Sequence, residues 1–422
     1  MKTDSNKNSA AAREDASINM PLSEFIPLIA ALMALVALSI DIMLPTLPNI
    51  ARSYALADPN EPQLVITSYL GGFALGQIMW GPASDRLGRR PVLLFGLCIY
   101  LAGAAGALLS GSFGTLLLMR ALQGLGAAAP RVISLAIVRD TFSGRPMARV
   151  MSFVMMVFLI VPILAPLLGQ ALAHQGGWQS TFYALVAFGL IILIWASVRL
   201  PETRHEADRK NARSESLRSS FASVLSNRQT VGYTIAAGFL FGCLMAYISS
   251  AQQVFVDVFK LGDAFPIVFG AVASVMIPAS ITNSRLVMRL GMRRLSQIAL
   301  VVFSIVSVGL TVIALMRTPP FIPFCGLLAS AFFCFGMIQP NFNALAMEPL
   351  NTDSGTGSSL IGFYQTGAAA LIGWFIGHLF DGTLLPLSVG FLVCALATFF
   401  VVMATEGPRN MFNTGPQHGS RR

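Results

Sequence analysis

The chain has 422 residues, of which 55% are hydrophobic and only 11% are charged, and its formal net charge is +9. Soluble domains are charged at about a quarter of their positions, so this composition excludes an ordinary soluble protein. The arginines lie in short segments beside apolar runs and do not interleave with aromatic residues, which argues against a nucleic-acid partner.

Apolar runs long enough to cross a bilayer recur along the whole chain, which predicts an all-α polytopic membrane protein. A transmembrane barrel is excluded, because its strands would be short and would alternate polar and apolar residues. We expect twelve transmembrane helices, at residues 22–50, 64–83, 91–110, 114–138, 147–173, 178–199, 229–257, 264–286, 296–316, 320–345, 358–379 and 383–404.

Polar segments divide these helices into two sets of six. Residues 1–21 are polar and lack the basic-then-apolar order of a cleaved signal peptide, so the first span would serve as the insertion signal. The charged, serine-rich segment 201–228 separates an N-terminal half, 22–200, from a C-terminal half, 229–404. Residues 405–422 form a second polar tail.

The basic residues predict the orientation. Of the 28 Lys and Arg residues, only Arg52, Lys260 and Arg317 fall in the expected outer segments, and Arg120 and Arg131 lie inside a span. The other 23 fall in the expected inner segments. Because positive charge stays on the cytoplasmic side, both tails and the 201–228 linker are expected to be cytoplasmic.

A strongly charged elbow follows the second span, within Gly-Pro-Ala-Ser-Asp-Arg-Leu-Gly-Arg-Arg. Its candidate gating residues are Gly81, Asp85, Arg86, Gly88, Arg89 and Arg90. The spacing of the two glycines and the aspartate favours a conformational gate over a purely topological role. A similar run, with Gly291 before Met-Arg-Arg, follows the eighth span, which indicates duplicated halves with a site between them.

Asp41 is the only acidic residue well inside an expected span. A carboxylate there costs several kcal/mol unless it is paired, protonated or hydrated, so we interpret it as a proton-binding group. Arg120 in the fourth span lies at a similar depth, roughly 9–14 Å below the outer surface at ~1.5 Å per residue. The two residues are expected to be coupled, with Gln123 holding the guanidinium. The alternative is a structural polar cluster.

Arg131 lies about three helical turns further in than Arg120, after a proline, in a span otherwise rich in Ala, Gly, Ile and Leu. An intramembrane cation normally faces a cavity, where it would attract anionic or polar substrates. The alternative is a side chain that snorkels to the cytoplasmic boundary.

Two further groups of residues are candidates for structure or for binding. Pro162, Pro166 and Gly169 would bend the fifth span or allow close packing at the boundary between the halves. In spans seven and ten, several polar side chains would either hydrogen-bond a substrate or join helices. They are Tyr247, Gln252, Gln339, Asn341 and Asn343.

No enzyme constellation is present: the sequence has no H-E-x-x-H, no G-x-x-x-x-G-K-[ST] and no G-x-S-x-G. All five cysteines fall within apolar spans, so we expect neither disulfides nor a metal site. We predict no catalytic residues and no cofactor, and expect the energy for transport to come from an ion gradient.

Several segments carry a resemblance to a known family. They are the elbow motif, Ser39-Ile-Asp-Ile-Met-Leu-Pro-Thr-Leu-Pro48, Arg120-Ala-Leu-Gln-Gly-Leu-Gly126 and Pro162-Ile-Leu-Ala-Pro-Leu-Leu-Gly169. Together they resemble the major facilitator superfamily, in its bicyclomycin- and chloramphenicol-resistance (Bcr/CflA) branch of drug:proton antiporters. The chain departs from that pattern at Ala165 and Gln170, where glycines are usual, at Gln179, where arginine is frequent, and at Arg131.

The resemblance implies two pseudo-symmetric six-helix halves that rock around a central site. It also implies proton-coupled export of small amphipathic drugs or metabolites across the bacterial inner membrane, by a monomer. Asp41 would carry the proton and Arg120 would couple it. Two alternatives stay open: proton-coupled uptake of a specific nutrient, and a membrane sensor that does not transport.

Overall fold

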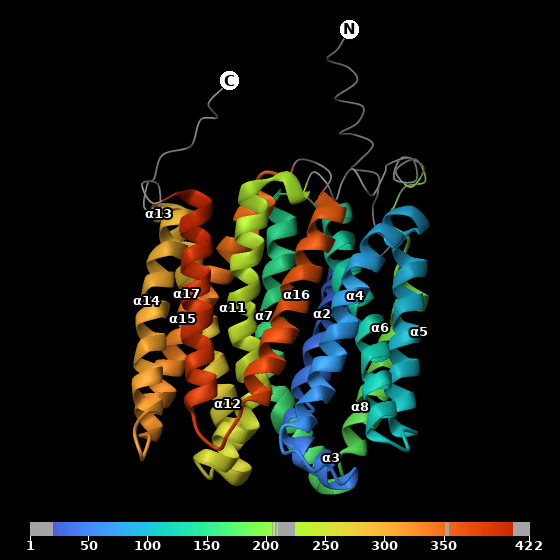
Figure 1. Cartoon of the computed structure of the whole chain (residues 1–422). Coiled ribbons are helices and arrows are strands. Elements are labelled where there is room, and N and C mark those ends of the chain that lie inside the picture. Colours follow the sequence, from blue (N-terminus) through green and yellow to red (C-terminus); the bar gives the residue numbers. More distant parts are fainter. Residues whose placement is uncertain are drawn as a thin grey trace.

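A computed structural model describes residues 20–142, 144–204, 206, 209, 224–350 and 354–407, and all regular structure in these residues is helical. The helices of the N-terminal half and its short connecting turns are α2 (Leu22–Asp41), η1 (Leu44–Thr46), α3 (Leu47–Ser53), η2 (Glu61–Gln63), α4 (Leu64–Leu87), α5 (Arg89–Leu108), α6 (Phe113–Thr141), α7 (Gly144–Gly176) and α8 (Gln179–Arg199). They run side by side as one bundle (Figure 1).

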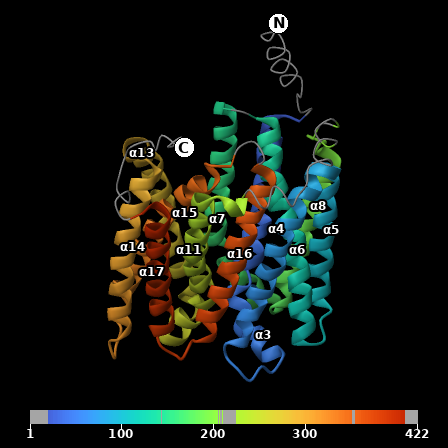
Figure 2. The ribbon, with the colours of Figure 1, turned by 45° about the horizontal axis from the view of Figure 1, so that its top comes forward.

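The C-terminal half repeats this plan. Its elements are α11 (Arg228–Gln252), the π-helix η3 (Gln253–Val258), η4 (Gly262–Ala264), α12 (Phe265–Ser274), α13 (Met276–Leu290), α14 (Met292–Ala314), α15 (Phe321–Met347), α16 (Ser354–His378) and α17 (Leu385–Glu406). Figure 2, with the top of the molecule forward, shows the two halves beside each other, with α16 next to α4. A second boundary is formed by α7 and α12.

The expected membrane spans are confirmed. Eleven helical segments of the described residues are long and apolar enough to cross a bilayer, and the expected fifth span coincides with α7, a helix of 33 residues. The top of the molecule in Figure 1 carries the starts of α5 and α14, which follow Gly88 and Gly291, and the last residues of α17. We call this the terminal end. The opposite end carries α3 and the start of α12, and we call it the far end.

Two expected spans are not single helices. The first, 22–50, is broken after Asp41, because Pro45 and Pro48 have no N–H to continue the helical hydrogen bonds. The eighth, 264–286, consists of α12 and α13, which meet at Val275. The break in the first span leaves a buried acid at a helix end inside the bundle.

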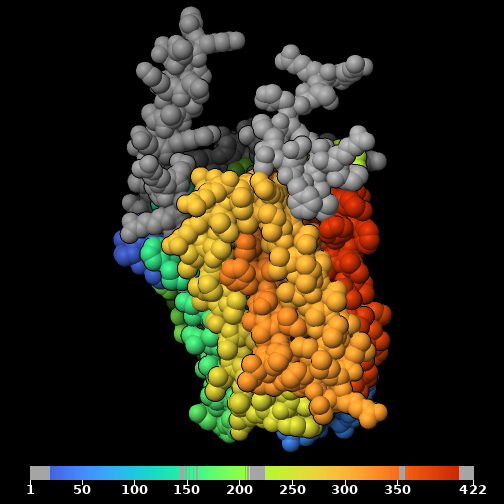
Figure 3. All heavy atoms as spheres, turned by 90° about the vertical axis from the view of Figure 1, so that its left-hand side faces the viewer, coloured from blue at the N-terminus to red at the C-terminus, as the bar shows by residue number. Residues whose placement is uncertain are grey.

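The outer surface of the bundle is apolar, as a lipid-facing surface requires. On α14, exposed hydrophobic side chains recur at three- and four-residue spacing and form one stripe along the helix. They are Ile298, Val302, Ile305, Val308 and Val312. The helix lies on the face that Figure 3 presents, beside α13 and α15.

Glycine allows the three helices α4, α5 and α6 to approach closely. A Cβ on Gly72 would lie 1.9 Å from the Ala121 carbonyl oxygen, and one on Gly124 would lie 1.9 Å from the Tyr69 carbonyl oxygen. Small residues at such crossings are the usual means of helix association in membranes. The close approach places the buried face of α6 directly against α4.

Candidate functional site

Asp41 is the last residue of α2 and is 3% exposed. Its Oδ1 atom has no hydrogen-bond partner in the described part of the chain. The carboxyl lies within electrostatic reach of Tyr69 in α4 and of Tyr247 in α11, so it stands near the boundary between the halves. A buried carboxyl that lacks a hydrogen-bond donor at one oxygen is suited to binding a proton.

Arg120 is completely buried in α6, and neutral groups hold its guanidinium. Nε donates to the Val65 carbonyl at 3.1 Å, Nη1 to Oε1 of Gln123 at 2.7 Å, and Nη2 to the Ser39 carbonyl at 3.0 Å. The guanidinium also lies 4.6 Å from the centre of the Tyr69 ring. The predicted contact with Gln123 is therefore present.

Asp41 and Arg120 do not form an ion pair within the described residues. Arg120 instead binds the backbone of α2 at Ser39, two residues before Asp41. The predicted coupling would thus pass through the α2 backbone. The Ser39 hydroxyl adds a contact to the Tyr100 hydroxyl at 2.9 Å, which joins α2 to α5.

Arg131 lies near the middle of α6 and is half-buried. Its Nη1 atom donates to Sδ of Met33 at 3.6 Å, and Met33 is fully buried in α2. The guanidinium is therefore directed toward α2.

Three of the polar candidates in the C-terminal half join helices to one another. The Tyr247 hydroxyl donates to the Phe269 carbonyl at 3.4 Å, and its ring stacks on Phe269 with centroids 5.1 Å apart. Asn341 donates to Oδ1 of Asn283 at 2.7 Å.

The third is Asn343, whose Oδ1 accepts from Nε2 of Gln365 at 2.9 Å. The other two candidates are differently placed. Gln339 has a buried Oε1 without a hydrogen-bond partner among the described residues. Gln252 lines a cavity at the far end.

This cavity of about 250 Å³ lies between the halves. Residues of α3, α7, η3 and α12 meet there. Its lining consists of Pro45, Pro48, Asn49, Gln170, Ala173, His174, Gln252, Val256, Gly262, Asp263, Phe265 and Pro266. The mixture of apolar walls and a few polar groups is typical of small-molecule pockets.

Side-chain amides join the two halves at the far end. Gln63 donates to Oε1 of Gln253 and to the Gly377 carbonyl at 3.2 Å, and Gln253 donates to Oδ1 of Asn60 at 2.7 Å. Gln63 and Gln253 are 2% and 5% exposed, and Gln253 begins the π-helical segment of the seventh span, a distortion frequent at functional sites. We call these three side chains the amide latch. They join the two halves at the far end.

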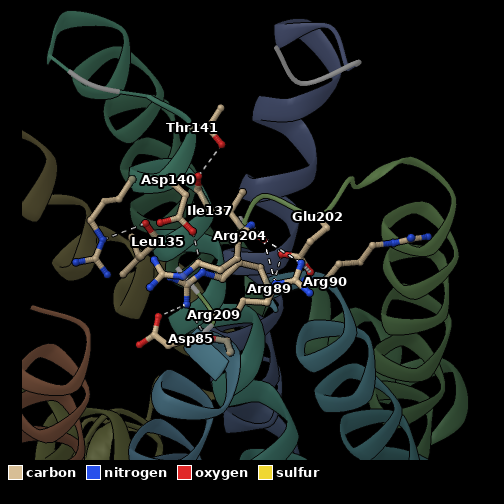
Figure 4. A network of polar contacts seen from close by, with 12 residues as sticks. Asp85, Arg89, Arg90, Leu135, Ile137, Asp140, Thr141, Glu202, Arg204 and Arg209 are labelled. Atoms are coloured by element: carbon tan, nitrogen blue, oxygen red, sulfur yellow. Dashed lines mark hydrogen bonds and ion pairs between the residues drawn. The ribbon is translucent and has the colours of Figure 1, made fainter. Parts of the chain in front are cut away.

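At the terminal end, the predicted elbow carries a network of charges, shown in Figure 4. Arg89 is nearly buried, and its guanidinium contacts Oδ1 of Asp85 at 2.7 Å and Oδ2 of Asp140 at 2.8 Å. The Ser84 hydroxyl accepts a further hydrogen bond at 2.7 Å. The network ties the end of α4 to the start of α5 and the end of α6.

Glu202, just after α8, completes this network. Its carboxylate accepts the backbone N–H groups of Arg89 at 2.9 Å and Arg90 at 3.2 Å, which otherwise lack partners at the start of α5. Gly88 has φ +107°, and a Cβ there would lie 2.5 Å from Glu202. Within the elbow, Gly81 is buried in α4.

Gly169 of the fifth span packs α7 against the end of α2 in the same half. A Cβ on Gly169 would lie 2.1 Å from the Ile42 carbonyl oxygen, next to Asp41. Pro166 is buried and Pro162 is half-buried in the same helix. Close packing is therefore observed at these positions.

The Major Facilitator Superfamily matches over residues 29–373. The chain belongs to that superfamily. It is 30% identical over 370 residues to a bicyclomycin resistance protein homolog of Haemophilus influenzae, covering 86% of this chain and 91% of that protein. It is also 32% identical over 206 residues to the multidrug resistance protein MdtL of Escherichia coli, covering 47% of this chain and 52% of MdtL.

Solved structures confirm the fold. The partially occluded inward-open xylose transporter XylE of E. coli has a TM-score of 0.71 at 13% identity, covering 91% of this chain and 97% of XylE. The human organic anion transporter MFSD10 has a TM-score of 0.66 at 17% identity, covering 90% and 99%. The relatives in sequence confirm the resemblance to the Bcr/CflA branch.

Sequence reasoning missed several residues of the site. Asp140 and Glu202 complete the elbow network, and they lie far from the elbow in the sequence, at the end of the fourth span and just after the sixth. The amide latch residues Gln63 and Asn60 lie outside the expected spans, and no local pattern marks them. Only their contacts across the boundary reveal them.

Proposed function

We propose that this protein exports small amphipathic drugs or metabolites from the cytoplasm in exchange for protons, by alternating access across a bacterial inner membrane. The observation that carries the proposal is the buried Asp41 carboxyl, which has one unpartnered oxygen and lies near the boundary between the halves. The relatives named for bicyclomycin and multidrug resistance support the class of cargo.

The orientation follows from the basic residues. The terminal end carries most of the arginines and is cytoplasmic, so the far end faces outward. Both tails and the linker are then cytoplasmic. The closed amide latch makes this conformation one that is sealed toward the outside.

Asp41 and Arg120 couple proton binding to movement. An ionised Asp41 attracts Arg120, which binds the α2 backbone at Ser39, and a proton on Asp41 removes that attraction. Because Asp41 also lies within reach of Tyr247, its charge state biases the contact between α2 and the C-terminal half. The membrane potential adds about 2.3 kcal/mol per charge per 100 mV to proton entry.

Other residues have supporting roles. The elbow network around Arg89 holds the terminal end of the N-terminal half rigid, so that Asp85 and its neighbours control the conformation rather than cargo binding. Arg131 and Gln339 face cargo, with Arg131 favouring neutral or anionic compounds. The protein works as a monomer, as each chain contains both halves.

The test is an efflux panel in bacteria that lack their own drug pumps. Expression of the protein should lower cellular accumulation of phenicol- or bicyclomycin-like compounds, and an uncoupler should abolish the effect. Increased accumulation of a compound upon expression would indicate uptake instead. Absence of any proton-dependent change across the panel would favour a sensor that does not transport.

A further inference from the structure

Two histidine–aspartate contacts cross the boundary between the halves at the far end. Nε2 of His174 lies 3.7 Å from Oδ1 of Asp263, and Nδ1 of His378 lies 4.0 Å from Oδ2 of Asp58. In the first pair the histidine belongs to the N-terminal half and the aspartate to the C-terminal half. In the second pair the order is reversed.

The internal repeat relates the two pairs. His174 lies near the end of α7, the fifth span, and His378 ends α16, the eleventh, which are equivalent helices of the two halves. Asp263 precedes the eighth span and Asp58 precedes the second, which are again equivalent. The same contact therefore occurs twice, and the internal repeat relates the two copies. Each copy joins a residue of one half to a residue of the other.

We propose that His174–Asp263 and His378–Asp58 are two proton-binding sites on the outer face, separate from Asp41, and that protons bound there hold the far end closed. The assignment of the far end to the outside rests on the proposed function. A protonated imidazole carries a positive charge, so each histidine in that form makes an ion pair with its aspartate.

The sign of the effect follows from the geometry. Opening the far end must part the two halves and therefore separates each histidine from its aspartate. A proton is thus bound more tightly in the closed conformation, so external acid favours closure. The side chains are 66% and 86% exposed in the first pair and 51% and 38% exposed in the second. Such exposed pairs contribute at most about fivefold each to the equilibrium.

The surroundings add few competing charges. Near His174, Gln170 donates to the same Asp263 oxygen at 2.8 Å, and the charged residues of the adjoining segments are Arg52, Asp257 and Lys260. None of these three forms an ion pair with His174 among the described residues.

Near His378, the charged residues of the adjoining segments are Asp58, Glu61 and Asp381, and Asp381 accepts from Thr383 of its own loop. The Trp374 ring stacks on His378 at 5.7 Å, but both belong to α16. That stacking therefore persists in either conformation and does not bias the equilibrium.

The two kinds of contact at the far end have different consequences. The amide latch is neutral and closes the far end at any pH, whereas the histidine pairs close it more firmly when the outside is acidic. In an exchanger driven by external protons, this would speed the return to the cytoplasm-facing state when the proton gradient is large. The response depends on external pH and needs no cargo.

The experiment measures opening of the far end directly, without cargo or transport. Spin labels are placed at Gly111 and Arg317, which lie in far-end loops of opposite halves, in a cysteine-free background reconstituted in nanodiscs. Distances between the labels are recorded by pulsed electron resonance from pH 8 to pH 5. Asp41→Asn is present throughout, so that titration of Asp41 contributes nothing.

We expect the ratio of closed to open molecules to rise several-fold on acidification, and His174→Gln with His378→Gln to abolish the rise. Exchanging the first pair, His174→Asp with Asp263→His, should retain the pH response. The control for surface charge is Asp381→Asn, which should leave the pH response unchanged. A pH response that survives the loss of both histidines would overturn the proposal. So would the absence of a pH response in the protein that carries Asp41→Asn alone. Because no export is measured, failure of the proposed function would leave this result unaffected.

Discussion

The interiors of the two halves differ in charge although their folds repeat. The N-terminal half buries Asp41, Arg89 and Arg120, and places Arg131 against α2. The buried polar residues of the C-terminal half, within the described part of the chain, are amides or hydroxyls, such as Gln252 and Asn341. Its acid Glu406, whose side chain is 5% exposed, lies at the terminal end of α17. Duplication of the fold has thus kept the helices but not the ionisable groups midway along the spans.

This asymmetry suggests a division of labour. Ionisable side chains inside a membrane are costly and are expected where ions move or where charge controls conformation. Neutral amides and aromatic rings are less costly and suit a surface that adapts to different cargo. The N-terminal half would then respond to protons, and the C-terminal half would supply most of the neutral wall of the site.

The largest expected effect comes from removing the buried acid. Asp41→Asn should abolish export against a gradient while the protein remains folded and inserted, because it deletes a charge that is costly to bury. The matched control is Asp257→Asn, an exposed acid of the C-terminal half, which should export normally. Both are measured as uncoupler-sensitive efflux, with protein amounts checked by size-exclusion chromatography. Export by Asp41→Asn at the parental level at every pH would refute its proton-binding role.

The next largest effect is expected at the elbow after the second span, compared with the similar run after the eighth span. Arg89 is 6% exposed and pairs with Asp85 and Asp140, so Arg89→Ala leaves two carboxylates without their cation and should cost about 3–5 kcal/mol. The C-terminal counterpart Arg293 is 25% exposed and lies 3.4 Å from Glu406, so Arg293→Ala should cost less. Thermal unfolding in detergent measures both. Equal losses would show that the N-terminal elbow is no more tightly built than its repeat.

How far the sequence predicts this molecule can be judged from particular residues. Hydropathy predicts the spans because a lipid environment requires long apolar helices, and Asp41 is conspicuous because it interrupts one. The helix break after Asp41 depends on Pro45, which is itself a local signal in the sequence. These features depend on residues that are close in the sequence, so local sequence patterns predict them.

Contacts with the backbone, and contacts between helices that are distant in the sequence, cannot be predicted from local patterns. The guanidinium of Arg120 binds the carbonyls of Ser39 and Val65, and every residue has a carbonyl, so no pattern marks those two. Two roles stay open for Tyr247 at the level of sequence, and its contact with Phe269 between α11 and α12 follows only from tertiary packing. The partners of a buried polar group follow from three-dimensional structure.

A smaller effect tests how tightly α4 packs against α6, compared with an uncrowded glycine of the C-terminal half. Gly124→Ala would place a methyl group 1.9 Å from the Tyr69 carbonyl oxygen and should destabilise the protein by about 1–3 kcal/mol. Gly326→Ala in α15 has no atom within 4 Å of the new methyl group and should be neutral or stabilising. Thermal unfolding of the two variants gives the comparison, and a neutral Gly124→Ala would contradict the tight contact between α4 and α6.

The smallest effect concerns the choice of cargo. If Arg131 faces the cargo path, its charge attracts anionic and electron-rich neutral compounds and repels cations. Arg131→Ala should therefore reduce export of phenicol- or bicyclomycin-like compounds several-fold and leave or improve export of lipophilic cationic dyes. Arg139→Ala, two turns further along α6 at an exposed position, is the matched control and should not change this preference. If cations are the best substrates of the parent and neutral compounds are unaffected by Arg131→Ala, the guanidinium acts at the membrane boundary, and the charged interior of the N-terminal half does not select cargo.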